Sequence, residues 1–270
     1  MQWNCVSRYI ARDEIIANIA PMLHLGVNID HVATLRQARY AQMPESPNAE
    51  PVVLDAAREC EAASAHSITV HLRADRRHIQ DADVWLLKRE LRVKLNLEMG
   101  NTPEIVDIAL KLKPDFVCLV PEHRQEVTTE GGLDVLSNVS SLKQTTARLQ
   151  ANGTLVSFFV DPVLDHMRAA RECGADMVEL HTGTFANAFG KERTSEIIRL
   201  NEAASLAHEL GLQVNAGHGL TTRNVRDLFV VPHLMELNIG HSLVARAVTI
   251  GLRAAVQEML AVMKDYRCDA

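Results

Sequence analysis

Eight short runs of apolar and β-branched residues recur along the chain, and longer segments with helical periodicity separate them. The runs are residues 24–30, 67–72, 94–99, 116–121, 154–161, 177–183, 212–218 and 234–240. They are too short for helices and rich in valine, isoleucine and leucine, as parallel strands covered on both faces are. Eight strand–helix units in about 250 residues predict an α/β fold of the (β/α)8 TIM-barrel type. An open, doubly wound parallel sheet is the structural alternative.

The segments between these runs carry apolar residues at helical spacing. The clearest are residues 81–92, 102–113, 192–211 and 242–266. Thr102 and Pro103 place a capping residue directly before a proline at the first helical position, and Gly211 lies where a helix C-cap belongs. Because no segment resembles a linker, we expect residues 23–270 to form one barrel domain with additional helices.

The first 22 residues precede the first predicted strand and form an N-terminal extension. They lack a secretory pattern, because Asp13 and Glu14 stand where an apolar segment would lie. A short amphipathic helix is one interpretation of this extension, with Ile10, Ile15, Ile16 and Ile19 on its apolar face. Met22 suggests another, in which the extension reflects an upstream start codon and is not native or is poorly ordered.

Charge and cysteine content narrow the class of protein. The net charge is −6 and no basic tract occurs, which argues against nucleic acid as a partner. The apolar runs fall far short of the roughly 20 residues of a membrane span, so no membrane partner is expected. Five cysteines without a CxxC motif indicate reduced thiols rather than a disulfide framework or a cysteine-rich zinc site. We therefore expect a cytoplasmic protein.

Polar side chains stand at the carboxyl end of nearly every predicted strand. In a barrel of this kind, these ends and the loops after them build the active site. The residues are Asn28, Asp30, His31, His71, Arg73, Asn96, Glu98, Glu122, Asp161, Glu179, His181, Asn215, His218, Asn238 and His241. Ionisable and amide groups are costly to bury unless they serve a purpose, so we predict a reaction site at the barrel mouth.

Proton transfer is the chemistry that these residues offer. Glu98 lies in an apolar strand, where desolvation would raise its pKa toward neutrality. His71 and His218 titrate near neutral pH and could relay protons around it. The structural alternatives are that Glu98 is the buried partner of a barrel arginine, that His71 is a hydrogen-bonded core histidine, and that Glu179 is structural.

Two anion sites are predicted beside these groups. The loops after the seventh and eighth strands commonly bind phosphate in such barrels, and Gly219, Gly240 and His241 would form that cradle. These glycines could also simply make tight turns. In the second site, Arg73 and His78 would reach inward from residues 70–79.

Residues 120–135 form a long polar loop that could close over the mouth. Thr128, within this loop, could donate a hydrogen bond to a phosphate.

The segments GVNIDHVATLRQAR, ITVHLRADRRHI, NLEM, CLVPEHRQEVTTEGGLDV, ELHTG, VNAGHGLT and ELNIGHSLV together resemble the pyridoxine 5′-phosphate synthase family. They occur in the family's order from residue 25 to about residue 260. The resemblance implies a barrel with extra helices, a homo-octamer, and catalysis with no metal and no organic cofactor. It also implies two phosphorylated substrates, 1-deoxy-D-xylulose 5-phosphate and 3-amino-2-oxopropyl phosphate, condensed to pyridoxine 5′-phosphate with release of phosphate and water.

The resemblance also implies a role for each site residue. Glu98 and His71 would accept protons, His218 would donate one, and Glu179 would stabilise a transition state. The residues expected to hold the aminoketone phosphate are Asn28, Arg39, Gly219, Gly240 and His241. Those expected to hold the deoxyxylulose phosphate are Asp30, His31, Arg73, His78 and Thr128.

The sequence differs from the family pattern in two places. Residues 40–51 are longer than the usual loop, which affects the expected geometry of Arg39, and Ala74 replaces a carboxylate.

Another phosphate-binding barrel enzyme, an isomerase or aldolase, is the main alternative function. No lysine ends a predicted strand and no His-x-His pair occurs on one, which disfavours a Schiff-base aldolase and a metal-dependent hydrolase. A non-catalytic metabolite-binding protein is the other alternative.

Overall fold

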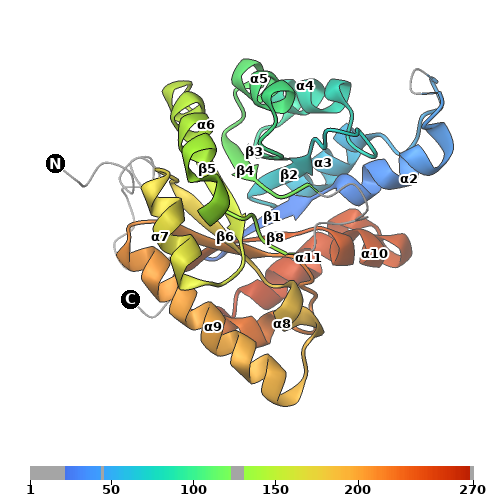
Figure 1. Ribbon diagram of the computed structural model, residues 1–270. Coiled ribbons are helices and arrows are strands. Elements are labelled where there is room, and N and C mark those ends of the chain that lie inside the picture. The colour runs from blue at the N-terminus through green and yellow to red at the C-terminus, as the bar shows by residue number, and fades with distance from the viewer. Residues whose placement is uncertain (1–21, 44–45, 123–130, 268–270) are drawn as a thin grey trace, which may run out of the picture.

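Eight parallel strands pair in sequence order and close into a barrel, because β8 also pairs with β1. The computed structural model describes residues 22–43, 46–122 and 131–267 (Figure 1). The strands are β1 (His24–Asn28), β2 (Ser67–His71), β3 (Lys94–Met99), β4 (Phe116–Leu119), β5 (Leu155–Val160), β6 (Met177–His181), β7 (Gln213–Gly217) and β8 (Leu234–Ile239). The predicted barrel fold is confirmed, and the open-sheet alternative is wrong.

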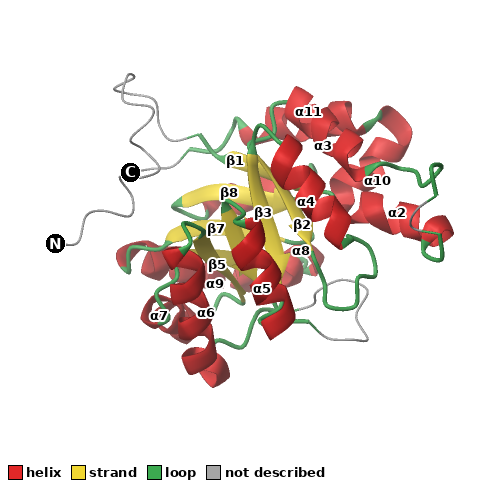
Figure 2. Ribbon diagram, turned by 90° about the horizontal axis from the view of Figure 1, so that it is seen from above, coloured by secondary structure: helices red, strands yellow, loops and turns green. Residues whose placement is uncertain are grey.

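Helices surround the barrel on all sides (Figure 2). They are α2 (Asp30–Tyr40), α3 (Val53–Ala62), α4 (Asp81–Glu90), α5 (Pro103–Leu112), α6 (Val139–Ala151), α7 (Leu164–Glu172), α8 (Gly183–Asn187), α9 (Gly190–Glu209), α10 (His241–Ile250) and α11 (Leu252–Met263), with the 3₁₀ helices η1 (Leu136–Asn138) and η2 (Val225–Val230). β1, β6 and β8 are each followed by two α-helices, which supplies the additional helices expected.

Most predicted strands extend past the observed ones at the carboxyl end by one or two residues. Asp30 was expected to end the first strand, and it instead begins α2. Gly183 likewise begins α8 rather than ending the sixth strand. In both places the polar end of the strand turns directly into a helix, so hydrophobic periodicity alone could not locate the boundary.

Gly251 divides the single helix expected over residues 242–266 into α10 and α11. Its backbone angles are φ 83° and ψ 152°, a conformation outside the helical region that glycine adopts at little cost. The apolar spacing on both sides continues to match a helix, and it therefore gave no sign of the break. Two shorter helices replace one long helix after β8.

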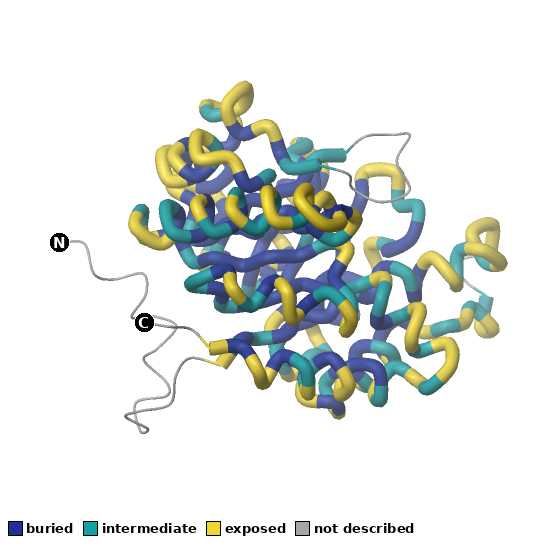
Figure 3. Tube along the Cα trace, turned by 90° about the horizontal axis from the view of Figure 1, so that it is seen from below, coloured by how far each residue is buried: buried dark blue, intermediate teal, exposed yellow. Residues whose placement is uncertain are grey.

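The two faces of the barrel strands differ in chemistry. Outward side chains such as Leu25, Val27, Ile68 and Val70 are fully buried and belong to the main apolar core between strands and helices. Figure 3 shows the buried strands inside a shell of helices whose outer sides are exposed. The main hydrophobic contribution to stability therefore comes from the layer outside the barrel.

The inner face of the barrel is largely polar, and its side chains bond across strands that are not neighbours. The Ser67 hydroxyl on β2 donates to Glu236 on β8 at 3.1 Å, and Thr69 donates to Asn238 at the same distance. Both bonds pass over β1 at Gly26, where an added Cβ would overlap the Asn238 side chain. The sequence analysis considered only the carboxyl ends of the strands, so it did not identify the polar side chains of Ser67, Thr69 and Glu236 deeper in the barrel.

Some expectations fall on residues that the structure does not describe. The extension up to residue 21, with its proposed amphipathic helix, lies outside the described residues, as does Thr128. The domain boundaries at 1–22 and 23–270 stay predictions. Within the described part of the chain, no helix combines the length and apolarity needed to cross a membrane. Cys60, Cys118 and Cys173 are buried free thiols.

Candidate active site

A cavity of about 400 Å³ opens at the carboxyl ends of the strands. It is lined by Asn28, Asp30, His31, His71, Arg73, His78, Glu98, Val120, Phe159, Glu179, His218, Gly219, Asn238, Gly240 and His241. Among the described residues to which the sequence analysis gave a catalytic or substrate-binding role, all but Arg39 line this cavity, and Thr128 lies outside the described residues. A volume of this size is typical of sites for small metabolites.

Arg39 lies away from the cavity. It is in the last turn of α2, is exposed, and its guanidinium carbon lies 5.7 Å from the centre of the Tyr40 ring. Arg39 does not line the cavity of the single chain, and its contact with a phosphate stays a prediction.

Glu98 lies at the centre of an acidic cluster. The side-chain amide of Asn28 donates to Glu98 Oε2 at 3.3 Å and to Asp30 Oδ2 at 3.0 Å. Burial raises the pKa of Glu98 well above its usual value, and the negative charges of Asp30 and Glu179 raise it further, while the Asn28 bond opposes the shift. These surroundings favour the protonated form of the Glu98 carboxyl group over its ionised form.

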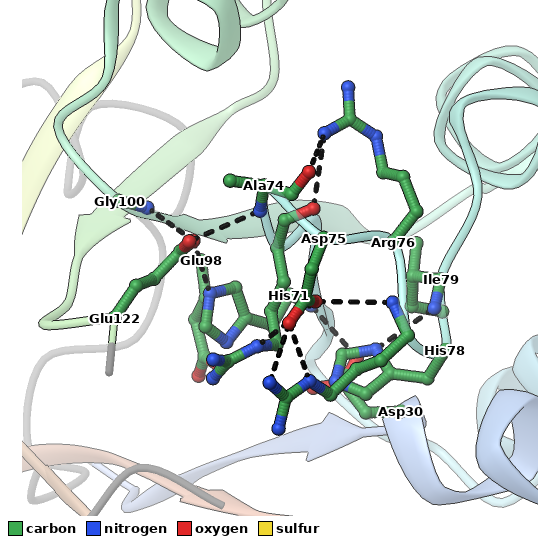
Figure 4. Close-up of polar contacts among 12 residues, drawn as sticks. Asp30, His71, Ala74, Asp75, Arg76, His78, Ile79, Glu98, Gly100 and Glu122 are labelled. Atoms are coloured by element: carbon green, nitrogen blue, oxygen red, sulfur yellow. Dashed lines mark hydrogen bonds and ion pairs between the residues drawn. The ribbon is translucent and has the colours of Figure 1, made fainter. Parts of the chain in front are cut away.

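Asp30 also fixes the end of β2. Its Oδ1 accepts a hydrogen bond of 2.8 Å from the backbone N–H of His71, and Figure 4 shows Asp30, His71 and Glu98 close together. The start of α2 is thereby attached to the strand that carries the predicted proton acceptor. The Glu98 and His71 side chains lie on adjacent strands, directly paired in register.

Glu179 is a second carboxyl group with a raised pKa. It is buried on β6, and burial raises its pKa to about 8, with a further contribution from the charge of Glu236. Asn238 donates to Glu179 at 2.7 Å and opposes this shift. Glu179 therefore titrates about one pH unit above neutrality.

His218 follows β7 in a left-handed backbone conformation, with φ 81°. Such a conformation costs free energy for a residue with a side chain, and it is found preferentially at functional sites. The imidazole packs edge-on against that of His181, with the ring centres 5.1 Å apart. Burial, with the added effect of His181 and His31, lowers the pKa of His218 to about 4, so its ring is neutral near pH 7.

The predicted phosphate cradle lies where α2 and α10 begin. The His31 and His241 rings meet edge-on with centres 4.9 Å apart, and Gly240 immediately precedes α10. A Cβ on Gly240 would lie 3.0 Å from Asn28 Cβ, so glycine permits this close approach. Ser242 donates to the carbonyl of Leu220 and joins the loop after β7 to α10. Helix N-termini of this kind attract anions.

The second predicted anion site lies after β2. Arg73 and His78 are both buried, and Arg73 Nε lies 3.5 Å from Asp75 Oδ1. Arg76 and Arg77 form ion pairs with carboxylates nearer the surface, Arg77 with the same Asp75 at 2.5 Å. Burial lowers the pKa of His78, and Asp30 partly opposes that effect. Arg73 thus supplies a permanent positive charge to the cavity lining.

Sequence analysis gave no role to several lining residues. Asn238 was noted only as a strand end, and Val120 and Phe159 were not identified. Phe159 lies two residues before Asp161, so strict alternation along β5 could have placed it on the inner face. Glu122 contacts His71 directly without lining the cavity.

Among the described residues, Asp30, His71 and Glu98 form the group able to approach a metal ion, with ligand atoms within 4.8 Å of one another. The Asp30 and Glu98 carboxyl groups accept hydrogen bonds from the Asn28 amide, Asp30 also accepts one from the His71 backbone N–H, and the His71 ring bonds Glu122. The raised pKa of Glu98 also favours a proton over a cation at this position. The donor set fits proton transfer better than metal binding.

A model of the family described as "Pyridoxal phosphate biosynthesis protein PdxJ" matches residues 25–265. The chain belongs to the PdxJ family. The match covers all eight barrel strands apart from the first residue of β1, and it covers the whole cavity lining.

Relatives in this family are similar over most of their length. The pyridoxine 5′-phosphate synthase of Akkermansia muciniphila is 57% identical over 236 residues, which cover 87% of this chain and 96% of that protein. The pyridoxine 5′-phosphate synthase of Synechococcus sp. strain CC9902 is 52% identical over 248 residues, covering 92% and 97%. The family resemblance inferred from the sequence segments is confirmed.

Solved structures with low sequence identity share the barrel fold. KGPDC from Streptococcus mutans has a TM-score of 0.63 at 10% identity, covering 91% of this chain and 99% of that one. Phosphoribosyl anthranilate isomerase from Thermus thermophilus has a TM-score of 0.55 at 11% identity, covering 91% and 100%. These similarities concern the fold alone.

Proposed function

We propose that this chain is a pyridoxine 5′-phosphate synthase. It would condense 1-deoxy-D-xylulose 5-phosphate with 3-amino-2-oxopropyl phosphate to pyridoxine 5′-phosphate, releasing inorganic phosphate and water. One observation carries the proposal: a single cavity brings titratable carboxyl and imidazole groups together with Arg73 and with Gly240 and His241 at the start of α10. Two relatives that bear this name are 57% and 52% identical to the chain over the aligned residues.

The two anion regions would hold the two substrates by their phosphates. Gly219, Gly240 and His241, with Asn28, would hold the aminoketone phosphate near the start of α10. Asp30, His31, Arg73 and His78 would hold the deoxyxylulose phosphate and its hydroxyl groups. The reacting carbonyl and amine groups would then meet near the acidic cluster, and this positioning makes the bimolecular step effectively intramolecular.

Substrate binding would shift the acid–base groups into their working states. The aminoketone arrives as an ammonium ion, and a cation beside Glu98 lowers the pKa of that carboxyl group. Glu98 would then release its proton to solvent, and the resulting carboxylate would accept a proton from the ammonium group, which must become a neutral amine to attack a ketone. Conversely, a phosphate dianion near His218 raises the pKa of that imidazole and makes it a proton donor.

Each later step also moves protons. Imine formation and the final dehydration expel water, and His218 would protonate the departing hydroxyl group. Elimination of phosphate and the aldol-type ring closure remove protons from carbon, and His71 and Glu98 would accept them. Glu179, opposite, would stabilise the cationic character that develops at the imine nitrogen.

The finer assignments belong to the same proposal. We place the enzyme in the transferase class, in the cytoplasm, and in a homo-octamer. The buried free thiols agree with a reducing compartment. Phe189 and Val248 are 78% and 82% exposed in the single chain, and such large apolar side chains are candidates for covering by another copy. Light scattering coupled to gel filtration measures the oligomer.

The direct test is to incubate the purified chain with both substrates and to quantify pyridoxine 5′-phosphate and free phosphate. Both products should appear together and at equal rates, and omission of either substrate should abolish them. Consumption of one substrate without the other would instead assign the chain to the rival class of isomerases and aldolases.

A further inference from the structure

Glu122 connects the ends of three consecutive strands through one carboxylate. It follows β4, and its Oε1 accepts hydrogen bonds from the backbone N–H of Gly100, after β3, at 3.0 Å and from His71 Nε2, on β2, at 3.1 Å. Its Oε2 accepts a third bond of 3.1 Å from the backbone N–H of Ala74. Figure 4 shows these three contacts converging on the Glu122 side chain.

The surroundings of Glu122 favour its ionised form. Burial alone would raise the pKa of Glu122, but the hydrogen bonds with His71, Ala74 and Gly100 lower it below its usual value. An ionised carboxylate can only accept hydrogen bonds. The nitrogen of His71 that faces Glu122 must therefore carry a hydrogen atom.

This bond assigns the two ring nitrogens of His71. The His71 side chain is 5% exposed and that of Glu122 14% exposed, so little water competes for the contact. In a neutral imidazole, a hydrogen on Nε2 leaves Nδ1 as the unprotonated nitrogen. A carboxylate partner that fixes a histidine tautomer in this way is a recurring device of histidine bases.

We propose that Glu122 is a positioning residue that holds His71 as the Nε2–H tautomer, so that Nδ1 is the atom that accepts the proton from the substrate. The consequence for turnover rests on the proposed function, whereas the tautomer itself does not. Glu122 belongs to the reaction site although it does not line the cavity.

The Glu122 carboxylate lies so close to Gly100 that there is no room for a side chain at residue 100. A Cβ at this position would lie 2.9 Å from the Glu122 carboxyl carbon and 3.0 Å from Oε1. Such distances are shorter than ordinary van der Waals contacts, so alanine would displace the carboxylate. Gly100→Ala therefore disturbs the contact with His71 without removing the charge of Glu122.

A purely structural role is the competing explanation. Through Ala74, Glu122 also fixes the loop that carries Arg73, the proposed ligand of a substrate phosphate. Loss of that function would raise KM for the deoxyxylulose phosphate. Loss of the correct His71 tautomer would lower kcat, and the two explanations therefore predict different kinetic parameters.

The test combines nitrogen-15 NMR of histidine side chains with kinetics. In protein labelled at histidine, the His71 signals are those lost in His71→Gln, and they should show a hydrogen on Nε2. In Glu122→Gln the new amide can donate a hydrogen bond to Nε2 of His71, so the Nδ1–H form of His71 should appear. Glu122→Asp keeps the charge and should retain part of the Nε2–H signal. Glu104→Gln, at an exposed carboxylate paired with Arg76, is the matched control and should match the wild type.

We expect kcat to fall in the variants in which the Nε2–H tautomer of His71 is lost. We expect Glu122→Gln to lower kcat about 10- to 100-fold, with KM for either substrate within about threefold of the wild type. Gly100→Ala should change both measurements in the same direction. An unchanged tautomer in both variants, or a loss confined to KM, would overturn the proposal. Failure of the wild-type chain to form pyridoxine 5′-phosphate would instead overturn the proposed function, and the NMR signals would still decide the role of Glu122.

Discussion

Asn238 donates a hydrogen bond of 2.7 Å to the buried carboxyl group of Glu179, across the barrel from β8 to β6. Gly217 on the strand between them has no side chain, and a Cβ there would overlap Glu179 Oε1. The bond lowers the pKa of Glu179 and opposes burial, which raises that pKa to about 8. The charge state of Glu179 near neutral pH therefore depends on one amide.

Asn238→Ala should raise the pKa of Glu179 further, because the ionised form loses its hydrogen-bond donor. If ionised Glu179 stabilises the transition state, the acidic limb of the kcat–pH profile moves about one pH unit to higher pH. Steady-state kinetics from pH 6 to 10 measure this shift. Asn101→Ala, at an amide that bonds Ser141, serves as the control. An unmoved limb would count against Glu179.

Glu98→Gln should reduce kcat by about 10²- to 10⁴-fold, the contribution typical of a general base. Glutamine is nearly the same shape and can still accept the hydrogen bond from Asn28, so the fold should be preserved. Circular dichroism and the thermal midpoint check the fold, and product formation checks the rate. Turnover within tenfold of the wild type would remove Glu98 from the mechanism.

Arg73→Ala should chiefly weaken binding of the deoxyxylulose phosphate. A hydrogen bond to a charged group contributes about 1.5–3 kcal/mol, so KM for this substrate should rise roughly 10- to 100-fold. KM for the aminoketone phosphate should change much less. Arg89→Ala removes an exposed arginine of α4 and is the control. Equal effects on both substrates would show that the two anion sites are not separate.

Glu236 lies in the barrel below the cavity and makes folding depend on pH. Burial raises its pKa from 4.5 to about 7, and the hydrogen bond from Ser67 opposes that shift. The folded chain therefore keeps this proton to higher pH than the unfolded chain, and the free energy of unfolding falls as pH rises from about 4.5 through about 7.

Glu236→Gln removes this dependence. Relative to wild type, the variant should gain on the order of 3 kcal/mol between pH 5 and pH 8. Urea unfolding at the two pH values measures the gain, and Glu209→Gln at an exposed position should show none. A constant difference between variant and wild type at both pH values would contradict the assigned pKa.

The sequence predicted the barrel and most of the cavity because strand ends are local features. Polar residues at the carboxyl ends of parallel strands must meet at one mouth, whatever the details of packing. That rule alone brought together Glu98, His71 and His218, which come from different strands. The rule could not place Arg39, because Arg39 is not at a strand end but in the last turn of α2.

Features that depend on distant contacts were not predictable. Glu122 and His71 are 51 residues apart, and nothing in either segment specifies the bond between them. The polar inner layers at Ser67 and Glu236 alternate with apolar residues as any half-buried strand does, so periodicity could not tell which face was the inner one. The break at Gly251 interrupts no apolar pattern.

The polar inner face of the barrel has a consequence for how this fold tolerates change. Since the main apolar core lies between strands and helices, residues at the mouth can be exchanged without repacking that core. Single substitutions at the mouth can therefore change substrate specificity with little effect on the stability of the barrel. The deeper layers allow less freedom, because each hydrogen-bonded side chain there constrains its partner on another strand.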